Sequence, residues 1–189
     1  MATFDEVVER IDALRAGRRR IVVGISGFGG AGKSTLARRL VEALPGSARL
    51  RGDDFLEPGL VGERSDDWSA VERRRLREEV LDPFRAGAPG SFRRRDWTTG
   101  RLRPAESLPD AEVLVVDAVG LFHPEIDGAL DLRVWVDVDL AVAADRGKSR
   151  DRRAGDGHDR LWDEVWVPND RDFAERFDPR AQADVEYRP

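Results

Sequence analysis

Nine consecutive residues of this 189-residue chain, Gly27 to Thr35, are of the types that surround phosphate groups in proteins. Their sequence, GFGGAGKST, fits the pattern G-x-x-x-x-G-K-[ST], in which backbone N–H groups of a glycine-rich turn bind phosphate oxygens. In that pattern Lys33 reaches the β- and γ-phosphates, and the Ser34 hydroxyl binds Mg²⁺. We therefore predict an ATP-binding P-loop made of Gly27, Phe28, Gly29, Gly30, Ala31, Gly32, Lys33, Ser34 and Thr35.

The segments on either side of the motif suit this prediction. The apolar run Ile21–Ile25 predicts a buried strand, and Ser34–Leu44 predicts a helix whose positive N-terminal end points at the anion. Lysine is also scarce, because only Lys33 and Lys148 among the 32 basic residues are lysines. Arginine does not replace a compact ammonium group on a flexible stem. A lysine at position 33 therefore favours phosphate binding.

Two other interpretations of the glycines were weighed. The simpler one is a tight turn before a helix, with no ligand. The other is a dinucleotide fingerprint, because Gly27, Gly29 and Gly32 also fit G-x-G-x-x-G and Asp53 follows about 20 residues later. That interpretation gives Lys33 no role and leaves the arginines near residue 150 unexplained, so we favour the P-loop.

Phosphoryl transfer also needs a carboxylate that accepts the proton of the acceptor hydroxyl and an acid for Mg²⁺. Asp53 and Asp54 follow a short strand, which places them at the carboxyl edge of a doubly wound sheet beside the phosphates. Adjacent side chains of an extended chain point apart, so one of the two is the expected base, unless they only form a turn. Asp117 ends the most apolar strand and is the candidate Mg²⁺ ligand, directly or through water; the alternative is a loop cap.

Arginines near residue 150 are the candidate cations for the transferred group. Arg146 and Arg150 stand four residues apart, on one face of a predicted helix. Gly147 within that helix and the glycines after it indicate a mobile lid at about residues 145–158 that closes over the phosphates and excludes water. The alternative is a solvated charged helix.

Composition limits the class of protein. We expect one domain over residues 1–189. The absence of cysteine excludes disulfides, thiolate metal sites and a cysteine nucleophile. There is no apolar run of about 18 residues and no signal-peptide core, which predicts a cytoplasmic protein without a membrane partner. The net charge of −5, with acids interleaved among the arginine runs, argues against nucleic acid as a partner. A homodimer is left open.

The periodicity of apolar residues predicts strands that alternate with helices. Predicted helices are Thr3–Ala16, with a Thr3–Glu6 capping box, Ser34–Leu44, Trp68–Phe84, Ala141–Arg153, and Leu161–Phe177 with a kink at Pro168. Predicted strands are Ile21–Ile25, Ala48–Arg51, Glu112–Asp117, Leu132–Val138 and an edge strand Ala183–Tyr187, with Phe92–Thr98 as a strand or hairpin arm. This alternation predicts an α/β fold with a parallel central sheet flanked by helices on both faces.

From about Arg20 to its C-terminus, the chain resembles the uridine kinase, phosphoribulokinase and nicotinamide riboside kinase family of P-loop kinases, whose fold is nucleoside-monophosphate-kinase-like. The resemblance is carried by Gly24–Gly27 through Lys33–Thr35, Asp53–Phe55, Val113–Asp117 with Leu121–Phe122, Val134–Asp137, Arg150–Asp151, Trp162, Trp166 and Pro168. It implies ATP as phosphoryl donor, a nucleoside or similar small alcohol as acceptor, and Asp53 as the catalytic base. The family usually has Glu where this chain has Asp117.

The sequence departs from this family where uridine and cytidine kinases bind the base. Their Tyr-Asp-Phe motif corresponds here to Arg95, Asp96 and Trp97, so that arginine replaces the tyrosine. Gly100 stands where those kinases have the His that follows the motif. The lid's usual pair of arginines is replaced by Arg146 and Gly147. Asp54, Phe55, Asp96 and Trp97 are the candidate acceptor-binding residues, each with a structural alternative.

The predicted function is an ATP-dependent small-molecule kinase that phosphorylates a hydroxyl group, in the manner of a uridine kinase. Asp53, Lys33, Arg146 and Arg150 are the predicted catalytic residues, and Ser34, Asp53 and Asp117 the predicted Mg²⁺ site. The alternatives are a P-loop ATPase or switch without an acceptor of its own, and a dinucleotide-binding oxidoreductase.

Overall fold

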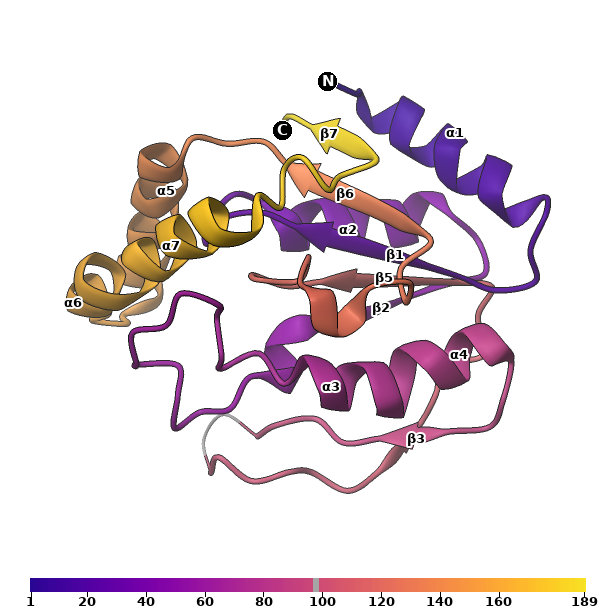
Figure 1. The fold of residues 1–189 in the computed structure, drawn as a ribbon, viewed down its shortest axis with the longest axis horizontal. Helices are drawn as coiled ribbons and strands as arrows, with labels where there is room; N and C mark the ends of the chain where they lie inside the picture. Colours follow the sequence, from indigo (N-terminus) through magenta and orange to yellow (C-terminus); the bar gives the residue numbers. More distant parts are fainter. Residues whose placement is uncertain (97–98) are drawn as a thin grey trace.

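A computed structural model describes residues 1–96 and 99–189. Its centre is a five-stranded sheet with the order β2-β5-β1-β6-β7, in which all neighbouring strands are parallel (Figure 1). The strands are β1 (Ile21–Ser26), β2 (Ser47–Arg51), β5 (Val113–Asp117), β6 (Leu132–Val136) and β7 (Val185–Tyr187). The predicted parallel α/β sheet is therefore confirmed, with β7 at the predicted edge.

Helices cover both faces of the sheet because successive strand residues point to opposite sides. Val23 and Ile25 of β1 pack in one core under α1 (Phe4–Arg15) and α2 (Lys33–Ala43). Val22 points to the opposite face, into a second core between the sheet and a continuous helix. This helix consists of α3 (Arg73–Leu76), the π-helical turn η2 (Arg77–Leu81) and α4 (Asp82–Ala86). Figure 1 shows this second helix below the sheet.

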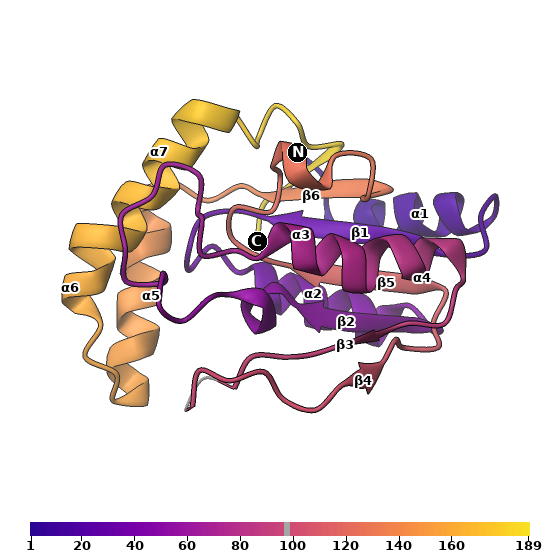
Figure 2. The same cartoon turned by 60° about the horizontal axis from the view of Figure 1, so that its bottom comes forward.

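A third group of helices lies beyond the carboxyl ends of the strands, at the left of Figure 1. It consists of α5 (Leu140–Ala154), α6 (Asp159–Leu161), the π-helical turn η4 (Trp162–Trp166) and α7 (Val167–Phe177). The 3-10 turn η1 (Gly52–Phe55) follows β2, and η3 (Pro124–Ile126) follows β5. Strands β3 (Ser91–Phe92) and β4 (Glu106–Ser107) form an antiparallel hairpin beside α3 and α4 (Figure 2).

The predicted helix Trp68–Phe84 begins too early. In the structure the helix begins at Arg73, because Trp68 has φ 53°, a left-handed conformation that no α-helix contains. The preceding residues are held by an antiparallel bridge between Leu56 and Val71. The helical periodicity of the charged segment did not reveal this turn.

The predicted strand or hairpin arm Phe92–Thr98 is too long, because β3 covers only Ser91–Phe92, residues 93–96 contain only an isolated bridge at Arg95, and residues 97 and 98 lie outside the described residues. The remaining predicted bounds agree with the structure to within two residues. The Thr3–Glu6 capping box is present, since Glu6 N donates to Thr3 Oγ1 and Thr3 N donates to a Glu6 carboxylate oxygen. The predicted disturbance at Pro168 appears as the π-helical turn η4, which ends directly before α7. Proline has no N–H to donate, and the hydrogen bond that is missing at Pro168 would end at the Glu164 carbonyl oxygen, within η4. Within the described residues, no helix is both long and apolar enough to cross a membrane.

Candidate functional site

The predicted P-loop lies between the buried strand β1 and helix α2, as the motif requires. Gly30 and Gly32 have φ 81° and 106°, values that residues with a Cβ rarely adopt. Gly32 is also the N-cap residue of α2, and no side chain caps this helix. The N–H groups of Lys33 and Ser34 therefore lie where they can bind an anion at the positive end of the helix, whereas Thr35 N donates to the Gly32 carbonyl oxygen.

The P-loop packs directly on helix α5. A Cβ at Gly30 would lie 2.1 Å from the Ala143 carbonyl oxygen, and a Cβ at Gly147 would lie 2.3 Å from the Trp162 ring. Both positions therefore need glycine for close packing. For Gly147 this packing, rather than the mobility inferred from the sequence, accounts for the residue. The lid at residues 145–158 stays a prediction.

Lys33 lies within the loop and is 8% exposed. Its Nζ donates hydrogen bonds of 2.8 Å to the carbonyl oxygens of Gly27 and Phe28. Burial lowers the pKa of the Lys33 ammonium group, and the negative charges of Asp170, Asp53 and Asp117 oppose this shift. The ammonium group is thus surrounded by carboxylates on three other elements and is held by weak backbone partners that a phosphate could replace.

Asp117, at the carboxyl end of β5, is buried beside the P-loop helix. The Ser34 hydroxyl donates to Asp117 Oδ2 at 2.7 Å, so two of the three predicted Mg²⁺ ligands are in contact. The guanidinium of Arg49 binds both oxygens of the same carboxylate, at 2.7 Å through Nε and 2.9 Å through Nη2. The sequence analysis missed Arg49. The sequence signal for Arg49 was a charged residue inside a predicted strand, two positions before the carboxyl end of β2.

Asp53 lies in η1 at the same edge, with a side chain that is 47% exposed. Desolvation by the surrounding groups raises the pKa of the Asp53 carboxyl, Lys33 opposes that shift, and Asp117 adds to it. Gly52 allows η1 to approach β5 closely, because a Cβ there would lie 2.3 Å from the Ala118 Cβ. The structure thus brings Asp53 into the same electrostatic environment as Lys33 and Asp117.

The predicted acceptor-binding residues have mixed positions. Phe55 is fully buried and stacks on Phe92, so its side chain is part of the second hydrophobic core. Asp54 is 6% exposed and its carboxylate binds Arg94 of the hairpin. Asp96 accepts a hydrogen bond from Thr99 N at 3.0 Å. Trp97 lies outside the described residues.

The two predicted lid arginines both lie on α5 and are exposed. Arg150 is near enough to Lys33 to lower the pKa of that ammonium group, and its Nη2 lies 2.7 Å from Asp151. Arg146 makes no hydrogen bond or ion pair with any described residue. Their catalytic roles stay predictions.

Asp170 is a site residue that the sequence analysis missed altogether. It is 4% exposed on α7, and its carboxylate accepts a hydrogen bond of 2.7 Å from the backbone N–H of Gly29 in the P-loop. Burial raises the pKa of the Asp170 carboxyl to about 6, against the opposing charge of Lys33. A polar residue within the amphipathic pattern of the last helix was the only signal for it in the sequence.

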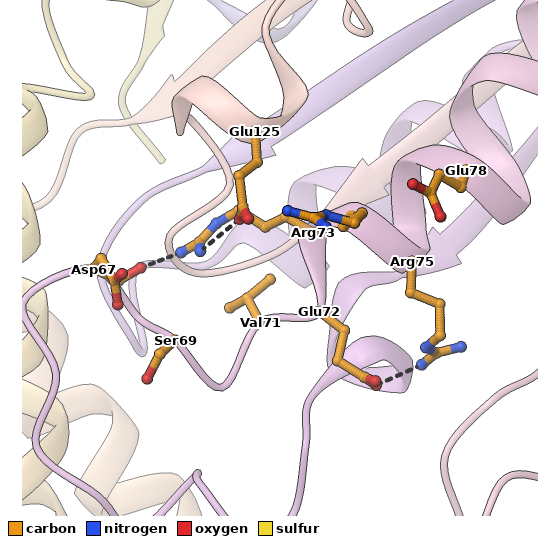
Figure 3. Close-up of a pocket in the computed structure, with 9 residues that line it drawn as sticks. Asp67, Ser69, Val71, Glu72, Arg73, Arg75, Glu78 and Glu125 are labelled. Carbon is orange, nitrogen blue, oxygen red and sulfur yellow. Dashed lines mark hydrogen bonds and ion pairs between the residues drawn. The ribbon is translucent and has the colours of Figure 1, made fainter.

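The fold also contains a cavity of about 450 Å³ beside α3 and η3, shown in Figure 3. Its walls carry both charges, with Arg73 and Glu125 3.5 Å apart. None of the P-loop residues lines it. The cavity is therefore separate from the predicted phosphate site.

Mg²⁺ needs one or two carboxylates, oxygens of the substrate and water rather than a complete protein cage. The described residues hold no cluster of three or more His, Cys, Asp or Glu side chains that would form such a cage. Ser34 and Asp117 nevertheless supply convergent oxygen atoms next to the loop. This donor set fits Mg²⁺ that is bound together with a nucleotide.

Comparison with known proteins supports the same class. Residues 23–166 match the family described as an AAA domain. Uridine-cytidine kinase C of Dictyostelium discoideum is 32% identical over 124 residues, which are 61% of this chain and 26% of that protein. The chain therefore spans about a quarter of that relative's length. A uridine kinase of Deinococcus deserti is 28% identical over 144 residues, 70% of this chain and 69% of that protein.

A solved structure described as a possible uridine kinase from Bacillus stearothermophilus has the same fold. It superimposes with a TM-score of 0.75 at 18% identity, covering 97% of this chain and 96% of that chain. The predicted P-loop kinase fold is thus confirmed in its overall architecture.

Proposed function

This chain belongs to the AAA domain family of P-loop proteins, and from that premise we propose that it is an ATP-dependent kinase that phosphorylates a hydroxyl group of a nucleoside or similar small alcohol. One observation carries the proposal. A lysine, a hydroxyl group and two carboxylates from three separate elements converge beside one glycine-rich loop: Lys33, Ser34, Asp53 and Asp117. The uridine kinase relatives support the acceptor class.

The P-loop positions the donor. The free N–H groups at the start of α2 bind the β- and γ-phosphates of ATP. Lys33 exchanges its two carbonyl partners for phosphate oxygens, an exchange that its flexible stem permits. The ammonium charge then stabilises the charge on the transferred group, and Arg146 and Arg150 are proposed to add to it.

Asp53 positions the acceptor. Its raised pKa makes the carboxylate a better proton acceptor than an ordinary aspartate, and its half-exposed side chain is accessible to a hydroxyl group. Asp53 accepts the hydroxyl proton as the oxygen attacks the γ-phosphorus, and ADP leaves. Asp54 then has a supporting role, because Arg94 already engages its carboxylate.

Ser34, Asp117 and Asp53 would hold Mg²⁺, which neutralises phosphate charge when it is bound. Arg49 keeps the Asp117 carboxylate in one orientation toward the loop. Mg²⁺ as the metal, a cytoplasmic location and the absence of nucleic-acid and membrane partners stay predictions from the sequence, as does the homodimer.

The test is ATP consumption with Mg²⁺ across a panel of nucleosides, vitamins and sugars, with mass spectrometry of the products. We expect one acceptor class to be phosphorylated. Asp53→Asn should lower kcat by about 10²–10⁴-fold, the usual contribution of a general base, while ATP affinity changes only a few-fold. Asp12→Asn, at an exposed position of α1, is the matched control. ATP hydrolysis that no added alcohol alters would instead favour an ATPase or switch.

A further inference from the structure

Asp170 connects two segments that lie far apart in the sequence. Its Oδ2 accepts from Gly29 N in the P-loop at 2.7 Å, and its Oδ1 accepts from the Trp68 indole Nε1 at 3.0 Å. Trp68 belongs to residues 56–72, the η1–α3 loop, which leads directly out of the turn that carries Asp53. One buried carboxylate therefore spans the donor side and the acceptor side of the cleft.

The neighbouring residue strengthens this connection. Asn169 is 1% exposed; its Oδ1 accepts from Ser65 N at 2.9 Å, and its Nδ2 donates to the Glu63 carbonyl oxygen at 3.0 Å. Two consecutive side chains of α7 thus hold the η1–α3 loop through its backbone and through Trp68. These contacts are specific hydrogen bonds rather than general apolar packing.

Trp68 itself is held in an unfavourable conformation. Its φ of 53° is unusual for a bulky residue, yet the side chain is 95% buried. Gly120 leaves room for it, since a Cβ there would lie 2.7 Å from the Trp68 Cβ, and Arg73 Nη2 donates to the Trp68 carbonyl oxygen at 3.2 Å. Strained residues persist only where the surroundings over-determine them, and they cluster at switch and ligand-binding regions.

We infer that Asp170 is a positioning residue that couples the P-loop to the η1–α3 loop, so that nucleotide bound at the P-loop orders the acceptor side of the cleft. The inference rests on the proposed function only in that a nucleotide binds the P-loop. A shift of the Gly29 backbone on phosphate binding is transmitted through the carboxylate to Trp68. Coupling of this kind requires contacts that differ between the nucleotide-free and the nucleotide-bound state, and we place that difference in the two hydrogen bonds of Asp170 to Gly29 and Trp68.

The carboxylate cannot be replaced by an amide at this position. Asp170 accepts one hydrogen bond at each oxygen, whereas asparagine has a single acceptor oxygen and would turn its NH₂ group toward one of the two donors. Asp170→Asn should therefore break one connection. Trp68→Phe removes the indole N–H that donates to position 170. Asp170→Asn should therefore destabilise the protein less in the Trp68→Phe background than in the wild type.

Amide hydrogen exchange of the full chain, with and without ATP, tests the coupling without any acceptor. In the wild type, ATP should slow exchange at residues 27–35 and also at residues 63–70. In Asp170→Asn and in Trp68→Phe, ATP should slow exchange at residues 27–35 only, with the ATP Kd within a few-fold. Glu175→Gln removes an exposed carboxylate from the same helix and should behave as the wild type.

Several results would overturn the inference. One is protection of residues 63–70 by ATP in both variants; another is protection confined to residues 27–35 in the wild type. The absence of any protection at residues 27–35 would refute nucleotide binding itself. Failure to find a phosphorylated product, with the coupled protection intact, would reject the kinase and leave the coupling standing. If Asp170→Asn does not fold, Trp68→Phe decides the outcome alone.

Discussion

The P-loop side of the candidate site and the side that we propose for the acceptor differ in the groups that shape them. On the P-loop side, backbone atoms determine the geometry: Gly30 lies against the Ala143 carbonyl, and Lys33 binds two loop carbonyls. On the acceptor side, side-chain ion pairs do so. Arg94 joins the hairpin to Asp54, and Arg95 binds Glu72 at 2.8 Å.

This difference has consequences for specificity. A site made of backbone atoms leaves no room for other side chains, so its residue types are restricted, and we expect it to accept any triphosphate of the right shape. Partly exposed ion pairs each contribute little to stability. The residues of these ion pairs can therefore be substituted without loss of the fold, and such substitutions can alter which acceptor is bound.

The two lysines of the chain provide the largest contrast. Lys33→Ala should lower kcat/KM by about 10³-fold, because it removes a preorganised charge at the transferred phosphate. Lys33→Arg should not restore activity, since a planar guanidinium does not place its charge where the compact ammonium group of this buried lysine lies. Steady-state kinetics would check both. Lys148→Arg, which keeps the ion pair to Asp163, is the control and should leave the rate unchanged. Wild-type turnover by Lys33→Arg would contradict the phosphate role.

Alanine at two glycines compares the sides directly. Gly30→Ala places a methyl group 2.1 Å from a carbonyl oxygen at φ 81°, and should destabilise the protein by about 3 kcal/mol. Gly59→Ala, in the η1–α3 loop, meets nothing nearer than 3.9 Å and should stay within about 0.5 kcal/mol. Urea denaturation gives both values. Equal effects would show that the acceptor side is as tightly packed as the P-loop side.

The connection between the sides should depend on pH. The pKa of Asp170 is raised from 3.8 to about 6 in the folded protein, so the native state binds this proton more tightly than the unfolded chain. The ionised carboxylate therefore costs stability above pH 6, and the cost disappears as the pH falls from 6 to 3.8.

An amide at position 170 does not titrate, so the comparison with Asp170→Asn isolates this effect. Relative to the wild type, Asp170→Asn should be more stable at pH 7.5 than at pH 4.5 by about 2 kcal/mol, because at pH 4.5 most of the shift between 3.8 and about 6 has been titrated. The cost of the misplaced amide does not depend on pH and cancels from this difference. Denaturation at the two pH values measures it; a difference of zero would mean that Asp170 titrates normally.

The smallest effect is expected on the acceptor side. Arg95→Gln removes the ion pairs to Glu57 and Glu72 and should change stability by less than about 1 kcal/mol. The KM of the acceptor should change several-fold while the KM of ATP stays constant. Kinetics with each substrate varied in turn distinguish the two. A change in the KM of ATP alone would contradict the placement of Arg95 on the proposed acceptor side.

Local patterns in the sequence predicted most of the elements. The capping box at Thr3, the strand β1 and the bounds of helix α5 depend on neighbouring residues, and all three agree with the structure. The start of α3 was missed because Trp68 adopts its left-handed conformation through contacts with Asp170 and Gly120. Those partners lie 102 and 52 residues away in the sequence.

The candidate site divides in the same way. The P-loop could be predicted from the sequence alone, because its nine residues are contiguous and their own backbone forms the loop. The contacts of Arg49 with Asp117 and of Asp170 with Gly29 could be found only in the folded structure. These partners are 68 and 141 residues apart, and they meet because parallel strands and the last helix end at one edge of the sheet. A contiguous motif predicts contacts between residues that are neighbours in the sequence, whereas contacts between distant residues form only when the chain folds.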